Sequence, residues 1–267
     1  MFYNLQKTEF KRSIFNTKFV ISVMIGTFFC YYGLTDYFLY DSQDFGIINQ
    51  VNAYRAWFTA MGIGNRSFYI LLVPVLATLP SAYLLLEERE SGHLKNIITR
   101  VSYKNYFKCK LFTSGISGGL ACALPPIIIF IICIIMYPAG LPNTPANTWG
   151  FHPEGLFENI YIYHPNIFIL LNCLLIFIFG FTYSTIGVTI SLFVNKKILV
   201  ILIPLIFYTF FNMVLEFFEA FTFSPKETVF PWLSARANFI SVYGELIIIL
   251  FVCIAICTSF NRKEKIY

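Results

Sequence analysis

Long apolar runs alternate with short polar segments along the whole chain. Each of the longest runs has about 20 residues or more, which is the length that an α-helix needs to cross a bilayer. There are six such runs, at about 19–39, 67–86, 111–137, 167–193, 198–218 and 239–260. The pattern therefore predicts an all-α membrane protein with six transmembrane helices, in which residues 1–267 form a single transmembrane domain.

Proline residues interrupt three of the predicted spans. They are Pro74, Pro80, Pro125, Pro126 and Pro204. A helix in lipid tolerates proline where neighbouring side chains satisfy the backbone groups that the proline frees. We therefore keep these runs as transmembrane spans and expect such neighbours in the structure.

The amino-acid composition excludes most other protein classes. Apolar residues make up 57% of the chain and charged residues only 12%, whereas soluble domains carry about 25% charged residues. A water-soluble globule, a disordered chain, a coiled coil and a secreted disulfide scaffold are therefore excluded. Of the seven cysteines, Cys109 lies in a basic loop and the other six lie in apolar runs, which argues against external disulfides.

Lysines and arginines are distributed unequally between the two sides of the predicted membrane. Fifteen lie in the two tails, the loop at 87–110 and the turn at 195–197, and four lie in the remaining loops. Basic loops stay in the cytoplasm, so both termini are predicted to be cytoplasmic. The bias toward Ile, Asn, Lys and Phe is typical of an AT-rich bacterial genome, which suggests a multi-pass protein of a bacterial plasma membrane. The net charge of +5 then reflects topology, and we expect no nucleic-acid partner.

The N-terminal stretch at 1–18 carries apolar and charged side chains at roughly helical spacing. Its apolar positions are Phe2, Leu5, Phe10, Ile14 and Phe15, and its charged positions include Lys7, Glu9, Lys11 and Arg12. This pattern predicts an amphipathic helix in the inner membrane interface, with its lysines toward anionic lipid headgroups. The alternative is a frayed basic tail that only enforces topology.

The loop at 87–110, between the second and third predicted spans, has its own amphipathic pattern. Leu94, Ile97 and Ile98 fall on one helical face, and Lys95 and Asn96 point elsewhere. A short helix of this kind beside the membrane could dock its apolar face into a groove of a soluble partner. The alternative is a solvated loop that carries topology charges.

The same loop contains the sequence E-R-E-S-G-H-L-K-N-I-I-T at 88–99, followed by Tyr106 and Lys110. It resembles the E-R-x-x-G-x-L-x-x-I-I-T segment of the ABC-2 type transporter permeases, the membrane subunits of bacterial ABC exporters. In that family a Tyr and then a Lys follow as the chain enters the third span. The family often has Pro or Gly where this chain has Arg100. The predicted architecture, with six spans and cytoplasmic termini, also resembles that of this family.

The resemblance implies that residues 87–110 form a coupling helix that contacts a soluble ATP-binding subunit. The residues of this contact would be Glu88, Arg89, Gly92, Leu94, Ile97, Ile98, Arg100 and Tyr106. A second permease subunit, identical or homologous, would complete the membrane part. ATP and Mg would bind the partner ATPase, in agreement with the lack of a G-x-x-x-x-G-K-[ST] motif in this sequence. The chain would then need no cofactor and would not be an enzyme by itself.

The cargo of such an exporter can be predicted only by class. The many aromatic and aliphatic residues favour an amphipathic or hydrophobic cargo, taken from the cytoplasm or the inner leaflet. A membrane-active peptide or an antibiotic fits this description, with export or self-immunity as the role.

Small residues recur at four-residue spacing in the third and fourth predicted spans, which predicts close helix packing. The residues concerned are Gly115, Gly118, Gly119, Gly180, Ser184 and Gly187. The Gly115-x-Ser117-Gly118 sequence also resembles the nucleophile motif of rhomboid intramembrane proteases. A serine nucleophile needs a general base, and none of the three histidines lies within a predicted span. An intramembrane hydrolase therefore remains the weaker alternative.

One acidic residue, Glu245, lies well inside a predicted span. A carboxylate there should be protonated, paired or facing a polar cavity, and a functional role is the default hypothesis. The alternative is that Glu245, only about six residues into the span, has its carboxylate near the outer interface. Glu216, near the outer end of the fifth span, could share a polar site with it. A proton-coupled secondary transporter that uses Glu245 is therefore a further alternative. We expect no metal site, because His152 and His164 lie in an outer segment at irregular spacing from glutamates.

Overall fold

The computed structural model describes residues 2–41, 52–63, 68–99, 101–139, 156, 158–233 and 237–260. Within these ranges the chain is helical, and no strand occurs in them. Five helices are long and apolar enough to cross a membrane. They are α2 (Thr17–Asp41), α7 (Tyr103–Met136), α9 (Pro165–Ile190), α10 (Lys197–Phe217) and α12 (Phe239–Phe260). The chain is therefore an α-helical protein with the composition of a multi-pass membrane protein.

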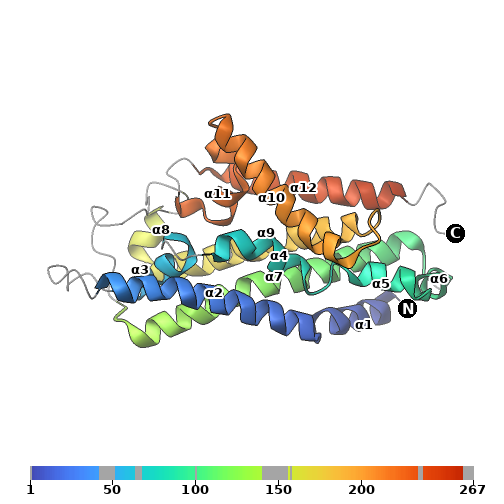
Figure 1. Cartoon of the computed structure of the whole chain (residues 1–267), viewed down its shortest axis with the longest axis horizontal. Helices are drawn as coiled ribbons and strands as arrows, with labels where there is room; N and C mark the ends of the chain where they lie inside the picture. The colour runs from blue at the N-terminus through green and yellow to red at the C-terminus, as the bar shows by residue number, and fades with distance from the viewer. Residues whose placement is uncertain are drawn as a thin grey trace.

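The remaining helices are shorter. They are α1 (Phe2–Ile14), α3 (Ala53–Phe58), the π-helix η2 (Thr59–Ile63), α4 (Tyr69–Thr78), α5 (Leu84–Glu90), α6 (His93–Ile98), α8 (Glu158–Tyr163), η4 (Phe221–Phe223), α11 (Pro225–Val229) and η5 (Pro231–Leu233). Figure 1 shows that α1 begins and α12 ends toward the end of the molecule that also carries α5 and α6. We call this the α6 end. The opposite end, with α3 and α8, is the α3 end.

The predicted second span, 67–86, is not one continuous helix. It consists of α4, a turn at 79–83 and α5. Pro80 lacks a backbone N–H, so the carbonyl of Leu76 four residues earlier loses its helical partner. The hydroxyl of Ser22 on α2 donates to that carbonyl at 2.8 Å. A neighbouring helix thus satisfies the backbone at the break, as lipid-embedded helices require.

The same compensation occurs at Pro125 and Pro126, the two adjacent prolines inside α7. α7 continues through Pro125 and Pro126, and the Cys122 carbonyl four residues before Pro126 accepts a hydrogen bond from the Tyr69 hydroxyl of α4. The Pro126 carbonyl accepts from the indole Nε1 of Trp57 at 3.0 Å. Since both donors are buried side chains of other helices, these contacts also fix α3 and α4 against α7.

Close packing of α7 on α9 forms the centre of the bundle. A Cβ added to Gly118 would lie 2.5 Å from the Ala77 carbonyl oxygen and from Ser184 Cβ, and one added to Gly180 would lie 2.8 Å from the Gly118 carbonyl oxygen. Gly115, Gly119 and Gly187 are equally close to side chains or backbone of neighbouring helices. The small residues singled out in the sequence therefore lie where helix backbones approach each other.

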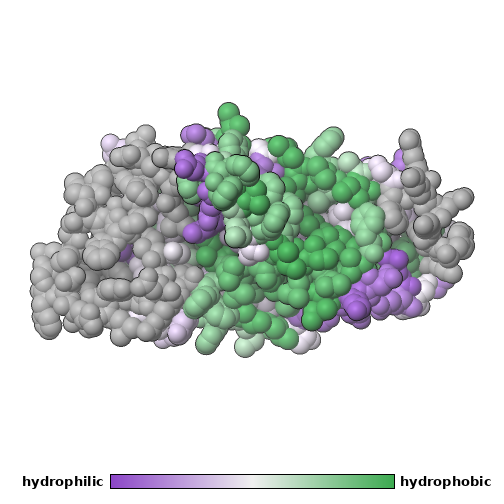
Figure 2. Space-filling view, turned by 45° about the horizontal axis from the view of Figure 1, so that its top comes forward, coloured by the Kyte–Doolittle hydropathy of each residue, from purple (hydrophilic) through white to green (hydrophobic). Residues whose placement is uncertain are grey.

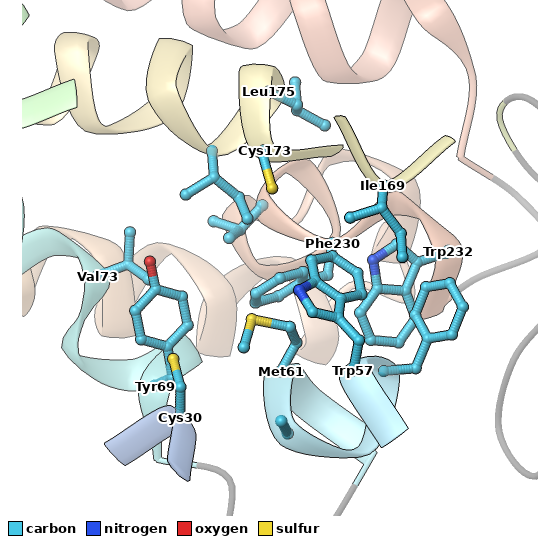
Figure 3. Close-up of a cluster of buried hydrophobic side chains, with 14 of the residues drawn as sticks. Cys30, Trp57, Met61, Tyr69, Val73, Ile169, Cys173, Leu175, Phe230 and Trp232 are labelled. Carbon is cyan, nitrogen blue, oxygen red and sulfur yellow. The ribbon is translucent and has the colours of Figure 1, made fainter. Parts of the chain in front are cut away.

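An aromatic cluster closes the α3 end of the core. Figure 3 shows Trp57 and Met61, from the α3–η2 segment, facing Phe230 and Trp232, with Tyr69 and Cys30 nearby. The rings of Phe58 and Trp232 lie 4.8 Å apart between centroids in an edge-to-face contact. This segment is therefore folded into the core.

The surface of the molecule separates apolar and polar regions. Figure 2 shows hydrophobic residues in a band across the middle of the described surface, with hydrophilic residues on both sides of it and the larger hydrophilic group toward the α6 end. Large apolar side chains of α2, α10 and α12 are exposed, among them Phe28, Phe210 and Phe251. Such a band suits contact with lipid tails and would be hazardous in water.

Candidate functional site

A buried cluster of charges joins α1, α5 and α7 at the α6 end. The Glu88 side chain of α5 is only 1% exposed, and its Oε1 lies 2.8 Å from Lys110 Nζ of α7 and 2.6 Å from Arg12 Nη1 of α1. Lys110 Nζ, on a side chain 2% exposed, also lies 2.7 Å from Glu9 Oε2 of α1. The Tyr106 hydroxyl donates to the second Glu88 oxygen. We call Glu9, Arg12, Glu88, Tyr106 and Lys110 the charge cluster.

The charge cluster is balanced and its ions are paired. Its two carboxylates face two cations, so each charge removed from water has a partner of opposite sign. Such an arrangement contributes little net stability, because desolvation offsets the attraction, but removal of one partner leaves an uncompensated buried charge. The cluster therefore ties three helices together in a way that tolerates few substitutions.

Arg89 fixes α5 to a fourth helix. Its Nη1 donates to the carbonyl oxygens of Ser191 at 3.0 Å and Leu192 at 3.1 Å, just after α9 ends. The last carbonyls of a helix have no helical donor, and a cation there also interacts favourably with the helix dipole. On the exposed side, Lys197 at the start of α10 lies 2.9 Å from Glu87 Oε1.

Gly92 lets the chain reverse between α5 and α6. Its φ of +71° lies in the left-handed region, where a side chain is strained. A Cβ there would meet nothing within 4 Å, so the backbone conformation alone favours glycine. The turn brings α6 back onto the bundle.

The apolar face of α6 packs on this chain's own helices. Leu94 is 3% exposed and belongs to a core cluster with Leu85, Phe107 and Leu192, and Ile97 and Ile98 pack against it. This face is therefore already occupied. The exposed positions of the helix and its flank are polar, namely His93, Asn96 and Thr99, whereas Arg100 lies outside the described residues.

The serines of the sequence motif form a hydrogen-bonded group between α7, α9 and the turn that follows α4. Ser117 Oγ lies 2.6 Å from Ser81 Oγ and donates to the Ser114 carbonyl at 3.0 Å. Ser114 Oγ lies 2.8 Å from Ser184 Oγ. Among the described residues, the side chain of Ser117 makes no hydrogen bond with a basic side chain that would take its proton, so this geometry gives no support to a hydrolase.

Glu245 lies in α12 beside α11. Its Oε2 accepts a hydrogen bond from Thr228 Oγ1 at 2.6 Å, whereas its Oε1 is buried without a hydrogen-bond partner. The Tyr183 hydroxyl of α9 is also buried without a partner, and it lies within electrostatic reach of the Glu245 carboxylate. Glu216 is exposed on the last turn of α10, and the structure does not place it in this hydrogen-bonded group.

No metal site is evident in the described part of the chain, where no three His, Cys, Asp or Glu side chains gather. His152 and Glu154 lie outside the described residues, and His164 directly precedes α9. The sequence interpretation did not identify Glu9 as a member of the charge cluster. A signal was present, since Glu9 is the one acidic residue in the otherwise basic stretch at 1–18.

No family model matches the chain, and neither does any curated protein or solved structure with which it was compared.

Proposed function

We propose that this chain is the permease subunit of an ATP-driven exporter of the ABC-2 type, and that the loop at 87–110 couples it to a separate ATPase. The observation that carries the proposal is the charge cluster. Glu88, Tyr106 and Lys110, which the resemblance to that family singles out, meet in one buried contact. Arg89 and Gly92 of the same motif attach and turn the loop.

Transmission of movement requires a loop that is rigidly attached to the helices that must move. α5 and α6 are held to α1 and α7 by the charge cluster, to α9 by Arg89, and to the core by Leu94. Displacement of α6 by a bound ATPase would therefore displace α1, α7 and α9 together. A solvated loop whose charges serve only topology would need none of these buried contacts.

The proposal includes the orientation and the partners. The α6 end faces the cytoplasm of a bacterial cell, the α4–α5 segment is the sixth, discontinuous span, and α1 borders the inner interface. ATP and Mg bind the partner ATPase, and a second permease subunit completes the path. The chain contributes no covalent chemistry. Its cargo is amphipathic or hydrophobic, and the difference in cargo affinity between two membrane states sets the direction of transport.

Purification from native membranes tests the proposal. The tagged chain is solubilised in mild detergent and its partners are identified by mass spectrometry. A stoichiometric soluble subunit with a P-loop is the expected result, together with ATP hydrolysis by the complex. Isolation of the chain alone in several detergents would contradict the proposal and favour the proton-coupled carrier.

The docking surface can be tested separately. The double variant His93→Glu and Asn96→Glu changes only exposed positions of α6, so it should weaken co-purification of the ATPase without loss of thermal stability. Lys226→Glu, an exposed change in α11, is the matched control. Normal ATPase binding by the double variant would place the partner on another surface. Leu94 is unsuitable for this test, because its substitution would disrupt the core.

A further inference from the structure

The carboxylate of Glu245 has an unfilled position on one oxygen. Thr228 occupies Oε2 at 2.6 Å, and Oε1 is shielded from solvent without a hydrogen-bond partner. No lysine or arginine among the described residues lies within ion-pair distance of this carboxylate. A buried carboxylate without a partner is costly, so the site lacks a donor that another molecule could bring.

A second group points to the same conclusion from a different helix. Tyr183 of α9 is fully buried, and its hydroxyl makes no hydrogen bond although it lies within electrostatic reach of Glu245. Buried tyrosine hydroxyls normally find a partner. α11 and α12 both pack on α9, so Thr228 and Glu245 belong to elements in contact with the helix that carries Tyr183.

The chemistry of these groups favours a compact cation with several donors. A guanidinium binds best through two parallel hydrogen bonds to both oxygens of a carboxylate, and the Thr228 hydroxyl at Oε2 competes for one of these positions. A primary ammonium is a point charge with three donors, and it needs only Oε1, the Tyr183 hydroxyl and one further acceptor. We infer that Glu245, Tyr183 and Thr228 form a binding site for the primary ammonium group of an amphipathic cargo.

The surroundings of the site suit the apolar part of such a molecule. α12 exposes Ile248 and Val252, which lie three and seven residues after Glu245 and therefore on the same helical face, and α10 exposes Phe207 and Phe210. An ammonium attached to an apolar chain could therefore bind Glu245 while its chain lies along these helices. Since Oε1 is covered in this structure, a ligand can reach it only after a local movement of the elements around Glu245.

This inference rests on the proposed function, because only an exporter would carry the bound molecule as its cargo. The binding site itself can be tested without an ATPase. The full chain is reconstituted in phosphatidylcholine nanodiscs, and its melting temperature is measured during titration with dodecylamine or with dodecanol, the neutral analogue. The amine should raise the melting temperature and the alcohol should not, since a ligand that binds the folded state stabilises it.

Variants then locate the effect. Glu245→Gln keeps the shape and an acceptor for Thr228 but removes the charge, so dodecylamine should bind about tenfold more weakly or worse. Tyr183→Phe should weaken binding by about threefold, as expected for one lost neutral hydrogen bond. The comparison of amine with alcohol on the unaltered chain needs no variant and holds even if a variant folds poorly.

Three results would overturn the assignment. They are equal effects of amine and alcohol on the unaltered chain, equal amine binding by Glu245→Gln, and disappearance of the amine effect when phosphatidylethanolamine replaces phosphatidylcholine. The last result would show that a lipid headgroup, which also carries a primary ammonium, occupies the site. The amine titration contains no partner protein, so its result does not depend on ATPase co-purification. Amine binding can therefore be observed when co-purification fails, and co-purification can succeed when no amine binds.

Discussion

Removal of the positive charge of Lys110 should release α1 from α7 while the long helices stay folded. Lys110→Met keeps most of the apolar volume of the side chain. Glu88 would retain Arg12 at 2.6 Å and the Tyr106 hydroxyl. Glu9, 2.7 Å from Lys110 Nζ, would lose the only ion-pair partner that the structure shows for it in the described residues. Glu9 is therefore the group on which the substitution acts.

The magnitude follows from the burial of Glu9, whose side chain is 8% exposed. An uncompensated buried charge costs about 3–5 kcal/mol, and Glu9 escapes this cost as a charged group when α1 moves away and exposes it to water. The free energy that holds α1 in place should fall by about 3 kcal/mol, the lower limit of that range. The population of the undocked state then rises on the order of 100-fold, since each 1.4 kcal/mol corresponds to tenfold.

Cys109 provides the assay. It is 1% exposed, neighbours Lys110 in sequence, and lies within electrostatic reach of Glu9. Its labelling by a membrane-impermeant maleimide in nanodiscs should require local opening, so the labelling rate reports the undocked population. A Cys109→Ser background corrects for the other six cysteines. Lys110→Met should label on the order of 100-fold faster than the unaltered chain.

Two further variants make this result interpretable. Lys108→Met removes an exposed lysine from the same helix, and its labelling rate should be unchanged. Adding Glu9→Gln to Lys110→Met removes the stranded carboxylate and should restore a large part of the slow labelling. The reasoning is refuted if Lys110→Met labels at the original rate, or if Glu9→Gln brings no recovery.

Two other predictions concern glycines. Gly118→Ala should destabilise the protein by about 1–3 kcal/mol, because its Cβ would lie 2.5 Å from a backbone oxygen of Ala77. Gly244 has open space around it, so Gly244→Ala should be neutral or stabilise the protein by up to ~1 kcal/mol. Thermal denaturation in detergent compares the two variants, and equal effects would contradict the packing interpretation. Gly92→Ala should cost about 1–2 kcal/mol through its φ of +71° alone. In limited proteolysis, Gly92→Ala should be cut more readily near α6, and Gly92→Asn should show a smaller increase in cleavage. An unchanged digestion pattern for Gly92→Ala would show that the turn carries no strain.

The long helices follow closely from the sequence, because a helix in lipid must satisfy its own backbone and needs enough apolar length to do so. The run at 239–260 coincides with α12, and the run at 198–218 differs from α10 by one residue at each end. The run at 67–86 is predicted as one span with prolines inside it, and the structure divides it into α4 and α5. Its break at Pro80 depends on Ser22, which lies 54 residues away from the carbonyl it binds. Such compensation is tertiary, so hydropathy alone does not reveal it.

The α6 helix shows a different limit of sequence interpretation. Its periodicity correctly indicates a helix with one apolar face, but periodicity does not say what covers that face. In the structure Leu94 packs on Phe107 and Leu192 of this chain. Amphipathic patterns report only that a face is buried. The sequence marks Glu9 as the one acidic residue of 1–18 but does not show that Lys110 is its partner, since 101 residues separate them.

The charge cluster also changes how the basic residues of this end should be counted. Lys110 and Arg12 belong to the fifteen residues that predict the orientation, yet both are paired with carboxylates, and Lys110 is removed from solvent. The orientation signal must then come from exposed lysines such as Lys11, Lys104 and Lys108. Lysines and arginines whose charge is neutralised by a buried carboxylate contribute to helix packing and not to orientation. Because they join α1, α5 and α7 at the level where the loop at 87–110 meets the bundle, they attach that loop firmly to the bundle, as the proposed coupling would require.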